Sequence, residues 1–420
     1  MAEITLIRPN TRSKNYQNLA TDIAAIEPPL FMALRATQLL WKEPEVIDAE
    51  IDGFGIDKLK DQRIEIFPTG NHPSAFIQQR EGIEKLKKNL EDRGNHVKVW
   101  DRIPLFDICN VANWGLFPIS KYRAHNWHCW GGYPRSPYGV VASSYSCPYN
   151  CQFCCIKDYY GNYIERPINS VMFDIERLVG KFGVTNIKFI DELFFYKPER
   201  VKELCERIIS KGFKLNMWAY ARVDTIDVSL LPLLKKAGFR WLCIGVESGN
   251  EEIRKKAFKG SFTNGKIKEV AKAISDNGIY INANYMFGFP DDNIKTLNET
   301  FDLAVLLNAE YANFYSMMAY PGSELYKQAL DNKWELPTTW SGYSQYSYDC
   351  HPLRTKHLTS EEVLRFRDNA FMSYYSNPEY LSMMDKFGEE TIQDIVDTIS
   401  VKLKRKLLEN PVCDTAVRVC

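Results

Sequence analysis

Four cysteines are crowded into one short stretch of the sequence, SYSCPYNCQFCC, at Cys147, Cys151, Cys154 and Cys155. The chain has 11 cysteines, and the others are scattered singly along it. An odd number of cysteines in a sequence without a recognisable export signal argues against a disulfide framework. The crowding therefore favours metal or redox chemistry in this stretch.

Cys147, Cys151 and Cys154 are spaced by four and three residues. Three thiolates on one loop can bind three irons of an iron–sulfur cube and leave the fourth iron without a protein ligand. A structural zinc loop would require a fourth Cys or His at a suitable spacing, and a ferredoxin run would require regular C-x-x-C steps ending in C-P. Neither pattern is present, so we predict a cluster with one open iron, with buried structural thiols or a zinc loop as the alternative.

The cysteine stretch follows the first of six repeats, each a short apolar run and then an amphipathic segment. This pattern predicts parallel strands joined by helical crossovers, and six units predict an open, partial β/α barrel. In such barrels the chemistry lies at the carboxyl ends of the strands, which form the barrel mouth. The expected strands are residues 139–144, 186–191, 214–219, 240–247, 280–287 and 311–317.

A second α/β pattern precedes the barrel, with four expected strands in ITLIRP, VIDAEID, RIEIFPTGN and HVKVW. It predicts a Rossmann-like or flavodoxin-like layer that stops about one strand early. After the barrel, residues 358–410 are expected to be helical, from a capping box at Thr359 and Glu362 to the basic ending, whose KLKRK run is expected to be a solvated helix face. The predicted units are an N-terminal domain at 1–105, a linker at 106–137, the barrel at 138–325 and a mainly helical region at 326–420.

Composition excludes several functional classes. Lys and Arg number 53, as do Asp and Glu, so the formal charge is zero and nucleic acid is not an expected partner. No apolar stretch approaches about 18 residues, so no membrane span is expected. The opening MAEITLIRPN does not resemble a signal peptide, so the expected location is the cytoplasm.

The Cys147-x3-Cys151-x2-Cys154 spacing, with Phe153 directly before the last cysteine, is similar to the signature of the radical S-adenosylmethionine (SAM) enzymes. The resemblance implies an α/β fold with a partial (β/α)6 barrel and a 4Fe-4S cluster bound by these three cysteines. It also implies that SAM binds the open iron and is cleaved to a 5′-deoxyadenosyl radical, with the electron supplied by a donor such as flavodoxin or ferredoxin.

The same resemblance implies SAM contacts at the strand ends. An acidic residue after the second strand would hold the SAM ammonium, with a surface ion pair as the alternative for Glu192. Arg222 would neutralise the methionine carboxylate or orient the substrate. Gly249 would permit close backbone approach, and a helix N-cap is the alternative for Ser248. The expected SAM contacts are Phe153, Asp191, Glu192, Arg222, Glu247, Ser248, Gly288 and Met317.

Four further segments, TGNHPSA, YRAHNWHCW, NMWAYARVDT and NFYSMMAYPGSELY, resemble the cobalamin-binding-domain radical SAM enzymes, in a branch associated with cell-envelope polysaccharide genes. The resemblance implies a cobalamin-binding-like N-terminal domain, truncated here by one strand. Cobalamin dependence stays open, because the missing strand removes part of the pocket unless the Trp-rich linker replaces it. The expected cobalamin contacts are Thr69, Gly70, Asn71, His72 and Ser74.

His125, His128 and Cys129 in the linker offer imidazole and thiolate ligands without a clear fourth ligand. The favoured interpretation is that this segment packs over the barrel mouth, with a metal site as the alternative.

The function implied by the resemblance is hydrogen abstraction from an unactivated carbon, leading to cobalamin-dependent C-methylation of a small molecule. A sugar, nucleotide-sugar or lipid is the expected kind of substrate. A cobalamin-independent epimerase, dehydrogenase or rearrangement enzyme is the first alternative, and a non-catalytic iron–sulfur protein is the second. The sequence singles out no catalytic acid or base.

Overall fold

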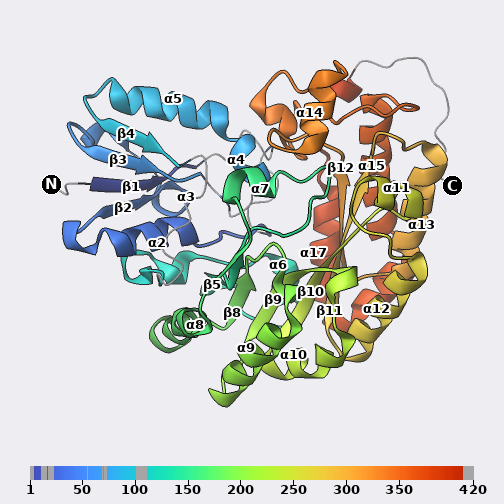
Figure 1. The fold of residues 1–420 in the computed structure, drawn as a ribbon, viewed down its shortest axis with the longest axis horizontal. Coiled ribbons are helices and arrows are strands. Elements are labelled where there is room, and N and C mark those ends of the chain that lie inside the picture. The colour runs from blue at the N-terminus through green and yellow to red at the C-terminus, as the bar shows by residue number, and fades with distance from the viewer. Residues whose placement is uncertain are drawn as a thin grey trace.

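The computed structural model describes residues 4–10, 17, 23–53, 55–68, 70, 73–100 and 111–409. Two parallel sheets dominate it, a small one near the N-terminus and a larger curved one, with further helices toward the C-terminus (Figure 1). Among the described residues, no helix combines the length and apolar character needed to cross a membrane.

The N-terminal sheet has four parallel strands in the order β2-β1-β3-β4. This is the start of the flavodoxin-like order, which normally continues with a fifth strand. Within the described residues no fifth strand joins the sheet. Residues 101–110, which follow β4, lie outside the described residues, so the truncation of this layer stays a prediction. The strands are β1 (Ile4–Arg8), β2 (Glu45–Asp48), β3 (Arg63–Ile66) and β4 (His96–Val99), and the helices are α2 (Leu30–Gln38), α3 (Ala49–Asp52), α4 (Pro73–Ile77) and α5 (Arg80–Glu91).

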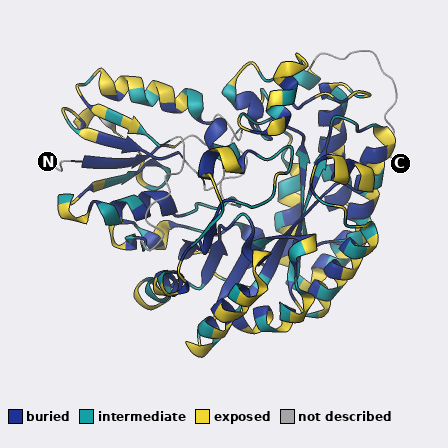
Figure 2. Ribbon diagram, in the orientation of Figure 1, coloured by how far each residue is buried: buried dark blue, intermediate teal, exposed yellow. Residues whose placement is uncertain are grey.

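The large sheet has six parallel strands in chain order, β5-β8-β9-β10-β11-β12, and β5 and β12 are its two edges. One long helix follows each of the first five strands and covers the outer face, which confirms the predicted partial (β/α)6 barrel. Most strand residues are buried, whereas Tyr311, Asn313 and Tyr315 on the inner face of β12 are half-buried. Figure 2 shows buried strands behind helices whose outer faces are exposed. The strands are β5 (Tyr138–Val141), β8 (Asn186–Phe189), β9 (Asn216–Arg222), β10 (Phe239–Glu247), β11 (Tyr280–Phe287) and β12 (Tyr311–Ser316). The crossover helices are α8 (Ile168–Phe182), α9 (Pro198–Ser210), α10 (Leu231–Ala237), α12 (Asn264–Asp276) and α13 (Ile294–Leu307).

The C-terminal region is helical, as predicted, with α14 (Glu324–Asp331), α15 (Ser360–Tyr375), α16 (Pro378–Met384) and α17 (Glu389–Ser400). The predicted capping box between Thr359 and Glu362 is present at the start of α15. This helix packs on β12, where the Tyr375 hydroxyl donates to the Ala312 carbonyl at 2.8 Å.

The prediction of a solvated helix face for the KLKRK run was correct only in part. Residues 401–405 are not helical, and Arg405 is only 3% exposed, whereas the three lysines of the run are exposed. Its guanidinium pairs with Asp368 at 3.0 Å and donates to the carbonyl of Gln345 at 2.8 Å. A buried ion pair with further hydrogen bonds offsets the desolvation of the arginine, and none of these partners is near it in the sequence.

The linker has two parts with different contacts. Its first described residues lie on α2, where the Thr37 hydroxyl donates to the Val111 carbonyl at 2.6 Å. Its second part, α6 (Asn126–Cys129), inserts Trp127 between Trp218 and Tyr311, near the starts of β9 and β12. The expectation that this part packs over the barrel mouth was therefore wrong, because it closes the opposite, amino-terminal end. The aromatic pattern indicated burial but could not indicate which end of the barrel is covered.

Candidate active site

The cysteine stretch forms a loop between β6 (Ser144–Tyr145), which pairs with β7 (Ile164–Glu165), and α7 (Ile156–Tyr160). Two distant segments hold its middle. The Gln152 N–H donates to the Ala257 carbonyl at 3.0 Å, and the Leu325 N–H donates to the Gln152 carbonyl at 2.9 Å. The loop is thus fixed by the connection after β10 and by the start of α14.

Cys147, Cys151 and Cys154 are partly exposed, whereas Cys155 is 2% exposed and precedes α7. The Cys151 thiol lies within electrostatic range of those of Cys147 and Cys154. Among the described residues, no three Cys, His, Asp or Glu side chains are close enough to share one metal ion. In a cubane cluster each cysteine binds a different iron, and three accessible thiols on one loop fit that arrangement.

Two cations lie beside Cys151. The Arg222 guanidinium, at the end of β9, donates to the Cys151 sulfur at 3.3 Å and forms an ion pair with Asp224 at 2.8 Å. The Lys259 ammonium forms a buried ion pair with Glu247 at 2.8 Å. Arg222 and Glu247 therefore lie at the cysteine loop, as their predicted roles require, and their contacts with SAM stay predictions.

Asp191 and Glu192 follow β8 and have different surroundings. Asp191 is buried and accepts hydrogen bonds from the Ser143 backbone at 2.8 Å and from the Ser144 hydroxyl at 2.7 Å. It therefore fixes the chain that leads into the cysteine loop. Glu192 faces a cavity, and burial raises its pKa to about 8, with Asp191 raising it further and Lys188 opposing the shift.

Ser248 and Gly249 pack against α13. The Ser248 hydroxyl lies 3.2 Å from that of Thr300, and the N-cap of α11 (Glu251–Lys256) is Asn250, so Ser248 is not a helix cap. A Cβ on Gly249 would lie 2.1 Å from the Glu299 carbonyl oxygen. The expected close backbone approach is present, and its partner is this helix.

Phe153 of the cysteine loop lies in one apolar cluster with Met317, a predicted residue at a later strand end. Phe153 packs edge-to-face on Phe289 with ring centroids 5.9 Å apart. Gly288 has a φ of 98°, and a Cβ there would lie 2.6 Å from Val363 and 3.5 Å from Met317. The contacts of these residues with SAM stay predictions.

A cavity of about 1010 Å³ lies between the inner face of the barrel and the N-terminal sheet. The N-terminal side contributes Arg8, Asn10, Glu50, Gly70, Ala75, Gln78 and Gln79 to its lining. Among the expected cobalamin contacts, Gly70 lines the cavity and Ser74 is adjacent to Ala75. Thr69, Asn71 and His72 lie outside the described residues.

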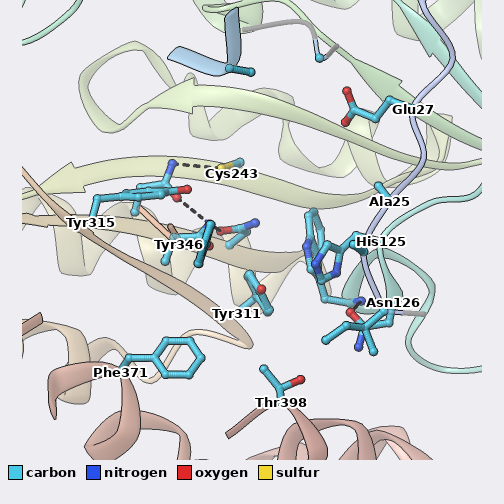
Figure 3. Close-up of a pocket in the computed structure, with 18 of the residues that line it drawn as sticks. Ala25, Glu27, His125, Asn126, Cys243, Tyr311, Tyr315, Tyr346, Phe371 and Thr398 are labelled. Carbon is cyan, nitrogen blue, oxygen red and sulfur yellow. Dashed lines mark hydrogen bonds between the residues drawn. The ribbon is translucent and has the colours of Figure 1, made fainter. Parts of the chain in front are cut away.

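The barrel side of the cavity carries an amide network that the sequence analysis missed. The Asn313 side-chain amide donates to the side-chain oxygens of Asn282 at 3.0 Å and Asn284 at 2.9 Å, and the Asn284 amide donates to the Cys243 sulfur at 3.4 Å (Figure 3). Aromatic rings surround the network, among them Tyr311, Tyr315 and Tyr346 in Figure 3. The alternation of Asn with apolar residues in YINANYMF was the signal that could have identified it.

Two cations of the barrel lining form ion pairs with carboxylates of the same cavity. Lys188 pairs with Glu27 at 2.5 Å, and Arg367 pairs with Asp368 at 2.7 Å. These pairs neutralise the cations within the barrel part of the cavity.

The linker residues His128 and Cys129 form no metal site within the described residues. Nε2 of His128 lies 3.0 Å from the Asn216 carbonyl, and burial lowers its pKa to about 3. Burial raises the pKa of Cys129 to about 12. These two side chains belong to the packing at the amino-terminal end of the barrel.

Comparison with known protein families matches residues 141–304 to the radical SAM superfamily. The chain carries a radical SAM domain. The matched region begins at the last residue of β5 and ends within α13, so it includes the cysteine loop, Glu192 and Arg222. The cofactors of this domain are a 4Fe-4S cluster and SAM.

Two curated relatives are similar to the radical SAM domain and its surroundings. An uncharacterized methyltransferase of Pyrococcus horikoshii is 28% identical over 276 residues, which are 64% of this chain and 56% of the relative. The anaerobic magnesium-protoporphyrin IX monomethyl ester cyclase of Cereibacter sphaeroides is 25% identical over 254 residues, 59% of this chain and 40% of the relative. The chain thus spans about half the length of the curated relatives it matches.

A solved structure shares the fold over nearly the whole chain. It is the radical S-adenosylmethionine methyltransferase TsrM from Kitasatospora setae, with cobalamin and a 4Fe-4S cluster bound. The TM-score is 0.65, with 13% identity, over 95% of this chain and 99% of that one. The match therefore includes the N-terminal sheet as well as the radical SAM domain. The narrower resemblance to a cell-envelope branch stays a prediction.

Proposed function

We propose that this protein is a cobalamin-dependent radical SAM methyltransferase that acts on a carbon atom of an uncharged small molecule. The observation that carries the proposal is the cavity between the barrel and the carboxyl edge of the N-terminal sheet. Its volume of about 1010 Å³ is at the upper end of the range for small-molecule sites. One cavity is thus lined by a candidate SAM-binding residue, Glu192, and by Gly70 of the candidate corrin-binding loop.

When bound, the cluster and SAM supply a hydrogen-abstracting radical, and cobalamin supplies a transferable methyl group. The side chains of this protein bind and orient the reactants. Glu192 provides a carboxyl group for the SAM ammonium. The apolar side chains of Phe153, Phe289 and Met317 provide a surface for the adenine. Gln78 and Gln79 place two side-chain amides at the N-terminal wall of the cavity, where they suit the amide-rimmed corrin.

The barrel wall supports an uncharged substrate. The Asn282, Asn284 and Asn313 network uses the Asn313 amide nitrogen internally and leaves the Asn313 oxygen without a donor among the described residues. Hydroxyl or amide groups of a substrate could form hydrogen bonds with this network, and the tyrosine and tryptophan rings could pack on flat faces of the substrate. A nucleotide-sugar is disfavoured, because Lys188 and Arg367 are already paired with carboxylates.

The relatives support this proposal in two different ways. The P. horikoshii relative carries the name methyltransferase, and the TsrM structure contains cobalamin beside the same fold. The C. sphaeroides relative carries the name cyclase, which favours a radical reaction without methyl transfer as the second candidate. A low-potential electron donor such as flavodoxin or ferredoxin stays a prediction.

Corrin binding distinguishes the two candidates. The full chain is purified without oxygen, mixed with hydroxocobalamin and separated from excess by gel filtration, and its corrin spectrum and 5′-deoxyadenosine production are measured. We expect the corrin to co-elute. Release of 5′-deoxyadenosine without a co-eluting corrin would exclude the methyltransferase and favour the second candidate.

A variant tests the location of the corrin. Ala75→Trp fills the N-terminal side of the cavity and is expected to abolish corrin binding. The iron and sulfide content should be unchanged, since Ala75 lies outside the cysteine loop. Unchanged corrin binding would place the corrin elsewhere.

A further inference from the structure

The Arg222 guanidinium is held in one orientation by contacts on several sides. Its Nε and Nη2 donate to the two carboxylate oxygens of Asp224 at 3.0 and 2.8 Å, and Nη2 also donates to the Lys259 carbonyl. The guanidinium carbon lies 3.8 Å from the centre of the Tyr149 ring. Arg222 is only 5% exposed, and the remaining nitrogen, Nη1, lies 3.3 Å from the Cys151 sulfur.

A second fixed cation adds to the positive charge at the same cysteine. The Lys259 ammonium interacts electrostatically with Cys151 and is held by Glu247. Gly245 makes room for this ion pair, because a Cβ there would lie 2.4 Å from the Glu247 carboxylate and 2.6 Å from the ammonium.

The three cysteines therefore have unequal electrostatic surroundings. Cys147 and Cys154 interact with the Glu192 carboxyl group, and Cys147 also interacts with Arg222. Cys151 interacts with both cations, Arg222 and Lys259. The positive charge is therefore concentrated at Cys151.

We propose that Arg222 is a positioning residue that donates an N–H···S hydrogen bond to the Cys151 ligand and raises the reduction potential of the cluster. The proposal rests on the cluster assigned above and goes beyond it by naming what sets its potential. Reduction adds one electron and hence one negative charge to the cluster, without making or breaking a bond. A donor and a positive charge at a ligand sulfur stabilise the more negative state, and hydrogen bonds to cluster sulfurs are a known determinant of potential.

The test is a redox titration of the reconstituted full chain without SAM. Dithionite is the reductant, and the electron paramagnetic resonance signal of the reduced cluster is measured against the solution potential. In Arg222→Gln, we expect the ratio of reduced to oxidised cluster at the wild-type midpoint to fall about tenfold, which is a shift of about 59 mV for one electron. Iron and sulfide content is measured on the same samples.

Arg222→Lys and Arg207→Gln serve as matched variants. Lysine keeps the positive charge but lacks the several N–H groups with which the guanidinium reaches both Asp224 and Cys151. We therefore expect the midpoint potential to fall by less than in Arg222→Gln. Arg207 lies on α9 with an exposed side chain paired to Glu203, and its variant should have the wild-type midpoint. A wild-type midpoint in Arg222→Gln with full iron content would overturn the proposal.

Asp224→Glu covers the case in which Arg222→Gln does not hold iron. It keeps both charges and displaces the anchor of the guanidinium, so the hydrogen bond to Cys151 is weakened and we again expect a lower potential. An unchanged midpoint in this variant would overturn the positioning role. Failure of the wild-type chain to assemble any cluster would instead contradict the function proposed above.

Discussion

Glu192 and Asp191 are neighbours in the chain, yet their carboxyl groups have opposite surroundings. Asp191 accepts hydrogen bonds from Ser143 and Ser144, whereas Glu192 faces the cavity. Consecutive side chains at a strand end point to opposite sides. The structure thus gives two similar residues different positions, one hydrogen-bonded to the chain before the cysteine loop and one lining the cavity.

Glu192 should make SAM binding depend on pH. Burial raises its pKa to about 8, so below that pH the carboxyl must lose a proton to pair with the SAM ammonium. We expect SAM affinity to rise as the pH increases from 6 to 8, with proton release on binding. Titration calorimetry in two buffers of different ionisation enthalpy measures both effects.

Glu192→Gln provides the matched comparison. Loss of a charge-assisted hydrogen bond costs about 1.5 to 3 kcal/mol, so SAM affinity above pH 8 should fall about 10- to 100-fold. The proton release should also disappear. In the wild-type protein, the raised pKa of Glu192 makes the free energy of unfolding decline as the pH rises from 4.5 to about 8. In Glu192→Gln this decline should be absent. Equal SAM affinity in both proteins would place this carboxyl away from SAM.

The strands of the barrel were predictable because each is a short run rich in apolar and aromatic residues that is followed by an amphipathic segment. The range predicted for β11, residues 280–287, agrees with the structure. Arg405 shows the limit of this reasoning, since its charge predicted exposure and only the three-dimensional position of Asp368 explains its burial. Trp127 shows a second limit, because an aromatic residue indicates burial without naming its partner.

Gly249 sets the distance between the end of β10 and α13. A Cβ there would meet the backbone of Glu299 and Thr300 at 2.1 to 2.7 Å, and backbone atoms cannot rotate away. We expect Gly249→Ala to destabilise the fold by about 1 to 3 kcal/mol, measured as a lower melting temperature.

Gly180→Ala is the control for Gly249→Ala. Gly180 lies within α8 and has no heavy atom within 4 Å of a Cβ at that position. Alanine there should stabilise the helix by about 0.5 to 1 kcal/mol. Equal melting temperatures for the two variants would show that α13 can move to accept the extra methyl group.

Buried polar contacts join the linker to the N-terminal sheet. The Asp48 carboxylate accepts hydrogen bonds from Arg8 at 2.7 Å and from the Tyr122 hydroxyl at 2.7 Å, and all three side chains are buried. Because Arg8 also lines the cavity, these contacts connect the position of the sheet to the shape of the candidate site. The domain boundaries themselves stay predictions.

Asp48→Asn should weaken this connection strongly. Removing one partner of a buried ion pair costs about 3 to 5 kcal/mol, since the other charge is left uncompensated. We expect faster hydrogen exchange in β1 and β2, measured by mass spectrometry. Tyr122→Phe removes only a hydroxyl and should cost about 0.5 to 1.5 kcal/mol, so equal exchange in the two variants would contradict the role of the ion pair.

The anchoring of the cysteine loop has a consequence for the order in which the protein matures. Gln152, between Cys151 and Cys154, bonds through its side chain to Gln328, 176 positions downstream, and through its backbone to Ala257 and Leu325. A chain emerges from the ribosome with its N-terminal part first, so the cysteines are synthesised long before the segments that shape their loop. Iron loading therefore belongs to a late stage of biogenesis, after the last barrel strand and α14 have left the ribosome.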